Sequence, residues 1–429
     1  MPNLTGLIGI GVLLALAWAM SSDRRRVPWK LILGGLALQL VIGVLLLKVP
    51  VVVDGFDIVA GMVNQAIGAT DAGIAFAFGH LADTQGGARF VFAIHAMSVV
   101  IFFASLMSVL YHIGAMQLLI GVLAWVLRRT LGVTGTEAMA MAANVFVGQT
   151  EAPLCVKPYI EAMTRSQLMT LMVGGFATIA GSVLAVYVGM LGGDDPIERT
   201  LFIRHLLTAS LMSAPAAFVM AKLIIPETGE PVDQGLSFRG MKSPHVNVID
   251  AAASGASEGV KLAINIVAML IAFVALLELC NMPIRWAGGE LDAAFGGGTI
   301  LAGLSIEGIL GWVFTPLAWA MGVEWADCPE FGTLLGEKLV VTEFVAYLHL
   351  GEMIHPEGGA APAISARTAQ IGTYALCGFA NFASIAIQIG GLSVIAPNRR
   401  REFVTLGVRA MFGGAFASWM TASVAGMLI

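Results

Sequence analysis

Two glutamates stand in segments whose other residues are mostly apolar, and their carboxylates are the first groups here that could do chemistry. Glu151 lies in the stretch VGQTEAPL, and Glu343 lies in the stretch GEKLVVTEFVAY. An ionisable side chain at membrane depth costs at least about 2.5 kcal/mol, so it is retained mainly where it serves a function. The two segments therefore predict a buried polar site.

Interrupted helices must position these carboxylates, because neither segment has an apolar run long enough to cross a bilayer. Residues 136–163 contain Gly148 and Pro153, and residues 332–355 have short apolar halves around a polar centre. A membrane span needs about 20 apolar residues. We expect each segment to form a re-entrant helical hairpin that enters and leaves on the same side.

Each predicted hairpin is followed by an apolar span with a polar break. The breaks are TIAGS at residues 178–182 and CGFAN at residues 377–381. Irregular backbone at membrane depth is tolerated only where protein or a watery cavity surrounds it. The order hairpin–span thus occurs twice, which is typical of an internal repeat with broken helices around a midplane site.

A simpler interpretation of the glutamates stays open at this point. Glu151 and Glu343 could cap helix ends, or they could form ion pairs with Lys157 and Lys338. His95 and His112 have no carboxylate at ligand spacing, which favours packing over catalysis or metal binding.

Composition identifies the solvent as lipid. Of the 429 residues, 58% are hydrophobic and 12% are charged, and the mean hydropathy is +0.85. A soluble domain is about 25% charged. The net charge of −5 includes no basic tract for nucleic acid, and the four scattered cysteines form no CxxC motif or disulfide framework.

Basic clusters predict the orientation. Arginines at residues 24–26, 128–129 and 399–401 are expected on the cytoplasmic side by the positive-inside rule. One span precedes the first cluster. Two spans lie between the first and second clusters, and residues 90–127 form the second of these spans. One span follows the third cluster. Both termini are then expected to be extracytoplasmic.

The pattern predicts an all-α integral membrane protein with about eight transmembrane helices, two re-entrant helical hairpins and an internal repeat. Residues 54–88 suit an interfacial segment, and residues 226–245 suit a flexible loop. Asn281-Met282-Pro283 and Asp292 are expected in a further loop. Small-residue runs favour close helix packing in lipid.

Three ordered motifs resemble the concentrative nucleoside transporter family of the sodium-coupled type. Residues 147–154 (VGQTEAPL) are similar to its first-hairpin signature, and residues 336–347 are similar to its G-x-K-x-x-x-N-E-F-V-A element. Residues 373–382 (TYALCGFANF) are similar to the family's next span. The resemblance covers nearly the whole chain. Thr342 departs from it, because the family usually has Asn there, which puts substrate preference in question at that position.

The resemblance implies a secondary active symporter that imports nucleosides with the sodium gradient by alternating access, and not an enzyme. It also implies a homotrimer in the cell's inner (plasma) membrane, with substrates of the uridine, cytidine and adenosine class. The resemblance further implies an inverted-repeat transport core and a scaffold part, and the scaffold would comprise residues 1–128 and 300–322. The transport parts would be residues 129–299 and 323–429.

The same resemblance assigns site residues. Those on the nucleobase would be Gln149, Thr150 and Glu151. Those on the ribose would be Glu343, Asn381 and Ser384, with Phe379 in the apolar wall. The Na+ ligands would be Asn144, Val147, Thr150, Thr178 and Ile179, where Val147 and Ile179 contribute backbone carbonyls.

Two other functions remain as alternatives. One is proton coupling, with Glu151 or Glu343 carrying the proton. The other is an intramembrane enzyme, because two buried carboxylates can act as an acid–base pair. Against the enzyme, the sequence has no GxGD-like aspartyl pair, no HExxH motif and no Ser–His arrangement.

Overall fold

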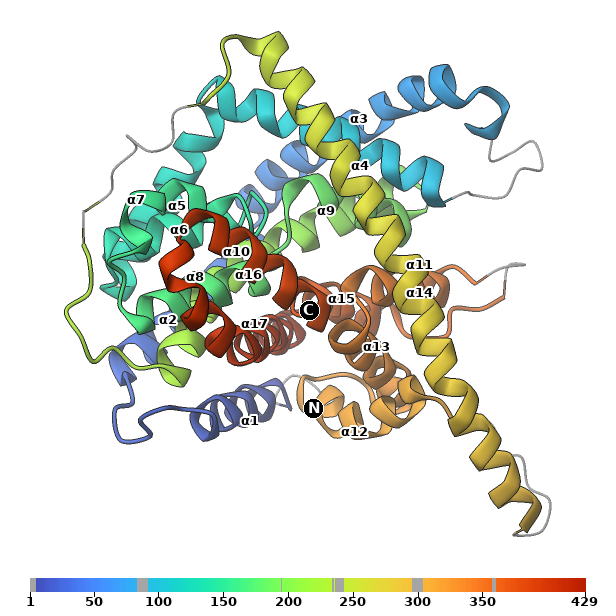
Figure 1. Ribbon diagram of the computed structural model, residues 1–429. Helices are drawn as coiled ribbons and strands as arrows, with labels where there is room; N and C mark the ends of the chain where they lie inside the picture. The colour runs from blue at the N-terminus through green and yellow to red at the C-terminus, as the bar shows by residue number, and fades with distance from the viewer. Residues whose placement is uncertain are drawn as a thin grey trace.

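The computed structural model describes residues 5–82, 92–193, 195–233, 235, 243–294, 304–356 and 360–429, and this part of the chain is helical without strands (Figure 1). The predicted loop 226–245 is only partly described, and the predicted boundary at residues 299–300 lies outside the described residues. The α-helices are α1 (Thr5–Ala19), α2 (Trp29–Lys48), α3 (Pro50–Phe78), α4 (Phe92–His112), α5 (Ala115–Leu131), α6 (Gly135–Asn144), α7 (Lys157–Ile160), α8 (Arg165–Ala177), α9 (Gly181–Gly192), α10 (Pro196–Ile224), α11 (Val248–Ala294), α12 (Ile306–Ala320), α13 (Cys328–Val340), α14 (Glu343–Ile354), α15 (Ala366–Leu376), α16 (Phe382–Ile395) and α17 (Arg400–Leu428).

Seven helical segments in the described residues are long and apolar enough to cross a membrane: α2, α3, α4, α8 with α9, α10, α11 and α17. The all-helical membrane fold predicted from the sequence is thereby confirmed. The number of transmembrane helices and the interfacial position of residues 54–88 stay predictions.

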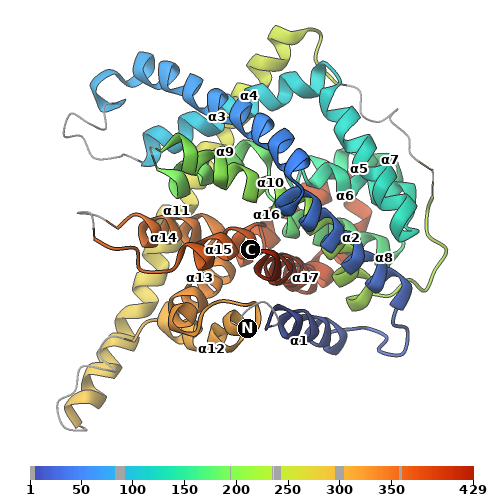
Figure 2. The same ribbon diagram turned by 180° about the vertical axis from the view of Figure 1, so that it is seen from behind.

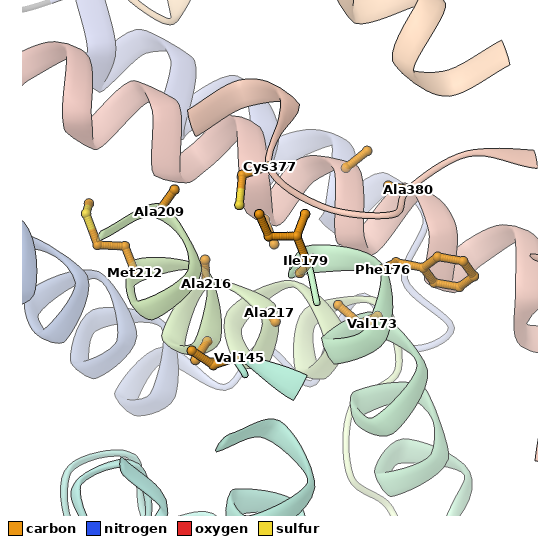
Figure 3. Packing of buried hydrophobic residues seen from close by; sticks show 14 of the residues in the cluster. Val145, Val173, Phe176, Ile179, Ala209, Met212, Ala216, Ala217, Cys377 and Ala380 are labelled. Atoms are coloured by element: carbon orange, nitrogen blue, oxygen red, sulfur yellow. The ribbon is translucent and has the colours of Figure 1, made fainter. Parts of the chain in front are cut away.

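Helix α17 lies at the centre of the molecule and contacts α1, α8, α10, α15 and α16. Figure 3 shows packing in this interior, where Val173 of α8 lies near Ala217 of α10. Nearly every residue of α8 is buried. Small side chains permit these close contacts, since helices in lipid associate by packing rather than by a hydrophobic driving force.

Helix α11 runs along one side of the molecule and extends beyond the other helices (Figures 1 and 2). It packs against α4, where Gly255 and Gly259 allow the backbone at Ile101 and Ala104 to approach closely. Most of its other side chains are exposed. The 47 residues of this helix exceed the roughly 20 that a span requires, so it crosses obliquely or continues past the bilayer.

Two expectations about helix boundaries were wrong. Asn281, Pro283 and Asp292 lie within α11, not in a loop, and the Asn281 amide donates to Glu307 (2.9 Å) and accepts from the Ile306 N–H (2.8 Å). These hydrogen bonds join α11 to the start of α12. The expected single span over residues 90–127 is also wrong, because a turn at Gly114, whose φ is +90°, separates α4 from α5.

All three basic clusters lie at one end of the molecule, which we call the basic end. The Ser22 N–H donates to Ile224 O (2.9 Å) at the end of α10. The loop that follows α10 reaches Arg128 through Asp233 (3.1 Å). Arg399 donates to Met163 O (2.9 Å), immediately before α8. The predicted common side of the clusters is therefore observed.

Both ends of the first hairpin, which comprises α6 and α7, are held at the basic end. The N–H of Gly135 donates to Asp233 (2.9 Å), and Met163 accepts from Arg399. Burial raises the pKa of Asp233, but the N–H donors of Gly235 and Gly135 and the charge of Arg128 outweigh it and keep that pKa below its ordinary value.

The second hairpin, α13 and α14, is held at the opposite end. Asp327 before α13 accepts from the Ser365 N–H (3.1 Å), and His355 after α14 donates to Leu191 O (3.0 Å). Leu191 terminates the α8–α9 span that starts at the basic end. The hairpins thus enter from opposite ends, which is the arrangement of an inverted repeat.

We predict that Gly414→Ala destabilises the protein by about 1–3 kcal/mol, because overpacking a tight contact forces the backbone apart. A Cβ on Gly414 of α17 would lie 2.8 Å from the carbonyl carbon of Phe176 in α8. Thermal unfolding in detergent measures the effect. Gly11→Ala is the matched control, since nothing lies within 4 Å of a Cβ there. Equal unfolding temperatures for both variants would contradict the prediction.

Candidate functional site

Four helix interruptions meet in the interior: residues 145–151 of the first hairpin, 178–180 between α8 and α9, 341–342 between α13 and α14, and 377–381 between α15 and α16. Hydrogen bonds and close packing connect them in series. The Gly181 N–H donates to Phe146 O (3.0 Å), which joins the first hairpin to the first broken span.

The series continues through Gly378, whose φ of +132° is accessible mainly to glycine. A Cβ at this position would lie 2.6 Å from Phe176 O, so the two broken spans touch through their backbones. Figure 3 shows Ile179 beside Cys377. The four breaks predicted from the sequence therefore form one continuous group.

Glu343 is the carboxylate at the centre of this group. It is 3% exposed and is the first residue of α14. One carboxylate oxygen accepts from the Tyr187 hydroxyl (3.0 Å), and the other accepts from the Asn381 amide (2.7 Å). Asn381 in turn caps α16 by accepting from the Ser384 N–H (2.7 Å). Helix N-termini favour negative charge, so α14 and Asn381 stabilise the carboxylate without a cation.

The ion pair between Glu343 and Lys338 that the sequence left open is not formed. Lys338 donates instead to Ala375 O (2.8 Å) and to the Ser418 hydroxyl (2.6 Å). Glu151 is exposed, and Lys157 is also exposed. Among the described residues, no ion pair involves either of these two side chains.

Helix α16 presents a polar face toward the first hairpin. Asn381, Ser384 and Gln388 recur at helical spacing, and Gly391 extends the same face. The Gln388 amide donates to Met172 O of α8 (3.0 Å). Sequence reasoning missed Gln388, although its spacing from Ser384 was the available signal.

The first hairpin packs directly onto this face. A Cβ on Gly391 would lie 2.9 Å from the methyl carbon of Thr150, and a Cβ on Gly175 would overlap Gln388 and lie 2.9 Å from the Gln149 Cβ. The Oε1 atoms of Gln149 and Gln388 are buried and accept no hydrogen bond within the described chain. These two amides offer acceptor and donor groups at one end of the site.

The predicted residues therefore fall into two groups along α16. Glu343, Asn381 and Ser384 lie together, and Gln149 and Thr150 lie about two helical turns further on. Gln388 lies seven positions after Asn381, which corresponds to about 10 Å along the helix axis. Phe379 is partly buried between the two broken spans. The structure does not join Glu151 to either group by a hydrogen bond in the residues it describes.

A separate set of oxygens lies where α6 and α8 end. The Thr178 hydroxyl donates to Asn144 O (2.8 Å) and Gly174 O (2.9 Å). The Asn144 side-chain amide donates to Ala140 O (3.1 Å), while its Oδ1 is buried and accepts nothing from the described residues. Carbonyl and amide oxygens at helix C-termini suit a hard monovalent cation.

Two other predicted cation ligands adjoin this set. Ile179 follows Thr178 and is 1% exposed, and Val147 is partly buried in the adjoining break. Thr150 lies against Gly391 of α16. In the described chain, no cluster of His, Cys, Asp and Glu could hold a metal ion. Carbonyl, hydroxyl and amide oxygens are donors that suit hard cations.

Ionic contacts of both hairpins were missed from the sequence. Lys222 of α10 pairs with Glu137 of α6 (2.6 Å) and Glu227 (3.4 Å). Within the second hairpin, Glu337 of α13 pairs with His349 of α14 (2.9 Å). Glu137, Lys222 and Glu337 each lie in apolar segments, which was the available signal. The Lys222 contacts fix the first hairpin to α10, and the Glu337 contact joins the two helices of the second hairpin.

Two oppositely inserted hairpins, two broken spans and a buried polar site define a secondary transporter with an inverted repeat. Three family models match the chain. "Na+ dependent nucleoside transporter" models match residues 8–81 at the N-terminus and 205–426 at the C-terminus, and a "Nucleoside recognition" gate model matches residues 93–194.

Individual relatives agree with the models. The chain is 42% identical over its full length to an uncharacterized transporter of Haemophilus influenzae, covering 98% of that protein. It is 38% identical over 99% of its length to sodium/nucleoside cotransporter 1 of Mus musculus, of which it spans 64%. The chain also spans 58% of the rat solute carrier family 28 member 3.

Solved structures of the transporter CNTnw have the same fold. An inward-facing, substrate-bound state gives a TM-score of 0.89 at 41% identity, and an outward-facing state gives 0.87 at 40% identity; each covers 100% of this chain and 98% of that one. The chain belongs to the Na+-dependent nucleoside transporter family. Its relatives and its fold are those of transporters, which excludes the intramembrane enzyme.

Thr342 occupies the N-cap position of α14, next to Glu343. Its hydroxyl accepts from the Val345 N–H (3.4 Å). Asparagine is an equally good N-cap, so the family's usual residue would preserve this helix end. The difference therefore lies in the amide that Asn would add beside the carboxylate, not in the fold.

We predict that Thr342→Asn changes the order in which different nucleosides compete for uptake, while the unfolding temperature stays the same. The reason is that an added amide donor alters hydrogen bonding beside Glu343. A panel of purine and pyrimidine nucleosides competing with a labelled one measures this order. Thr342→Ser, which keeps a hydroxyl cap, should behave as the unmodified chain. An unchanged order in Thr342→Asn would show that this position does not set preference.

Proposed function

We propose that this protein is a symporter that imports nucleosides by using the sodium gradient, through alternating access in the inner membrane. The observation that carries the proposal is the buried Glu343 carboxylate held by Tyr187 and Asn381 (3.0 and 2.7 Å). A carboxylate has about four acceptor positions, so two remain for a ligand. Ribose diols would donate to them, and such charge-assisted bonds are about twice as strong as neutral ones.

The base would lie toward the first hairpin. Gln149 and Gln388 have buried amide oxygens that no described group satisfies. A base edge carries the complementary N–H and C=O groups, and buried polar partners reject ligands that lack them. Thr150 and Glu151 follow in the same break, and Phe379 and Ser384 would complete the wall and the ribose end.

Sodium would bind to Asn144, Val147, Thr150, Thr178 and Ile179. The unpartnered Oδ1 of Asn144 supports this assignment, because a buried acceptor without a donor is expensive unless a ligand satisfies it. The ion would fix the first-hairpin break against the first broken span. Since Gln149 follows Asn144 by five residues in the same break, ion binding would also organise the base site, which couples the two ligands.

The inverted hairpins support alternating access. The first hairpin is anchored at the basic end and the second at the opposite end, so each would close the site from one side. We propose that hairpins and broken spans move together against a scaffold of residues 1–128 and 300–322 within a homotrimer. The basic end would face the cytoplasm, with both termini outside.

Uptake of labelled uridine and adenosine into proteoliposomes tests the function. We expect accumulation with an inward sodium gradient and little without it. Empty liposomes provide the control. Equal uptake with and without the sodium gradient would contradict sodium coupling, and accumulation driven by a proton gradient alone would establish the proton-coupled alternative.

We predict that Thr178→Val raises the sodium concentration for half-maximal uptake by about tenfold or more, because it removes one oxygen from the ion's surroundings. Sodium titration of uptake measures the effect. Thr170→Val is the matched control, since Thr170 is equally buried in α8 but bonds only to Ser166 O (3.1 Å). If both variants raised the sodium concentration for half-maximal uptake equally, the effect would come from helix packing and not from a lost sodium ligand.

A further inference from the structure

Lys338 is a fully buried cation that neither proposed ligand site uses. Its side chain is 0% exposed, within the last turn of α13. The ammonium donates to Ala375 O (2.8 Å) and to the Ser418 hydroxyl (2.6 Å). Ser418 donates its own hydrogen to Ala415 O (3.0 Å), so its lone pairs are available to the ammonium.

No carboxylate compensates this charge within ion-pair distance in the described chain. A buried charge without a partner is costly, so its surroundings must supply negative potential. Two helix ends do so here. Helix α13 ends at Val340 and α15 ends at Leu376, and their last carbonyls and dipoles are negative.

The first repeat has the same arrangement without a basic side chain. There α6 ends at Asn144 and α8 ends at Ala177, and the Thr178 hydroxyl bridges carbonyls of both helices. The buried Oδ1 of Asn144 has no donor in the residues described. Helix α6 corresponds to α13 and α8 to α15, because each pair holds the same place in the order hairpin–broken span. Both places thus lie at helix C-termini, but only the second contains an ammonium, which bonds to Ala375 O and Ser418.

We propose that the Lys338 ammonium is a resident cation, occupying in the second repeat the place that sodium takes in the first. The inference deepens the proposed function and rests on it for the identity of the sodium. Lys338 is a positioning residue. By neutralising and anchoring the end of α15, it fixes the break that carries Asn381 onto Glu343.

Chemical rescue tests the charge directly. Lys338→Ala opens the space while leaving Ala375 O and Ser418 in place, and we expect nucleoside binding to weaken about tenfold or more. Propylammonium should restore binding, whereas propanol, its neutral analogue, should not. Lys338→Met, which fills the space without a charge, should remain weak. Lys157→Met, at an exposed lysine of the first hairpin, should bind normally.

Two results would overturn the proposal. One is normal binding by Lys338→Met, and the other is equal restoration of Lys338→Ala by propanol, since either would mean that the lysine only fills space. Nucleoside binding is measured on purified protein, and thermal unfolding verifies that each variant is folded.

The unmodified chain provides a measurement that does not depend on any variant. Because Lys338 would occupy the cation place of the second repeat, one positive charge should enter with each nucleoside. A ratio of two charges per nucleoside would overturn the proposal that Lys338 is a resident cation. Uptake without sodium dependence would refute the proposed function instead. In that case, the comparison of propylammonium with propanol still decides the role of Lys338.

Discussion

An interrupted helix inside lipid must find hydrogen-bond partners that lipid cannot supply, and this constraint organises the molecule. Four interruptions lie together, and each satisfies part of the next. Phe146 O accepts from Gly181, the backbone at Gly378 lies against Phe176, and Asn381 donates to Glu343. Losing the first contact would leave a backbone N–H and carbonyl unpaired in an apolar surrounding, and losing the last would leave a buried carboxylate with one donor fewer.

The direction of the half-helices then decides which charges the group accepts. Glu343 lies at the start of α14 and beside the start of α16, where the dipoles are positive. Asn144 and Lys338 lie where helices end, where the dipoles are negative. One inverted repeat therefore creates an environment for a carboxylate and environments for cations without pairing them directly.

The sequence predicted the hairpins and broken spans because glycine, proline and carboxylates interrupt apolar runs at Gly148, Pro153 and Glu343. It also predicted that the basic clusters share one side. It could not predict that Asn281 lies inside a helix, because the stabilising partner, Glu307, belongs to another element. Nor could it show that Lys338 and Glu343 form no ion pair, since two residues close in sequence can bond to different helices. Gln388 lies four residues after Ser384, but the sequence does not show that its partner, Met172 O, belongs to α8.

Glu343 belongs to the second repeat, yet one of its two donors, Tyr187, lies on α9 of the first. The carboxylate thus joins the two halves of the molecule at the point where the ligand would sit. Pulling the halves apart would strip a buried carboxylate of a hydrogen bond. The Tyr187–Glu343 bond therefore couples the two repeats at the site, and separating them there would cost this interaction.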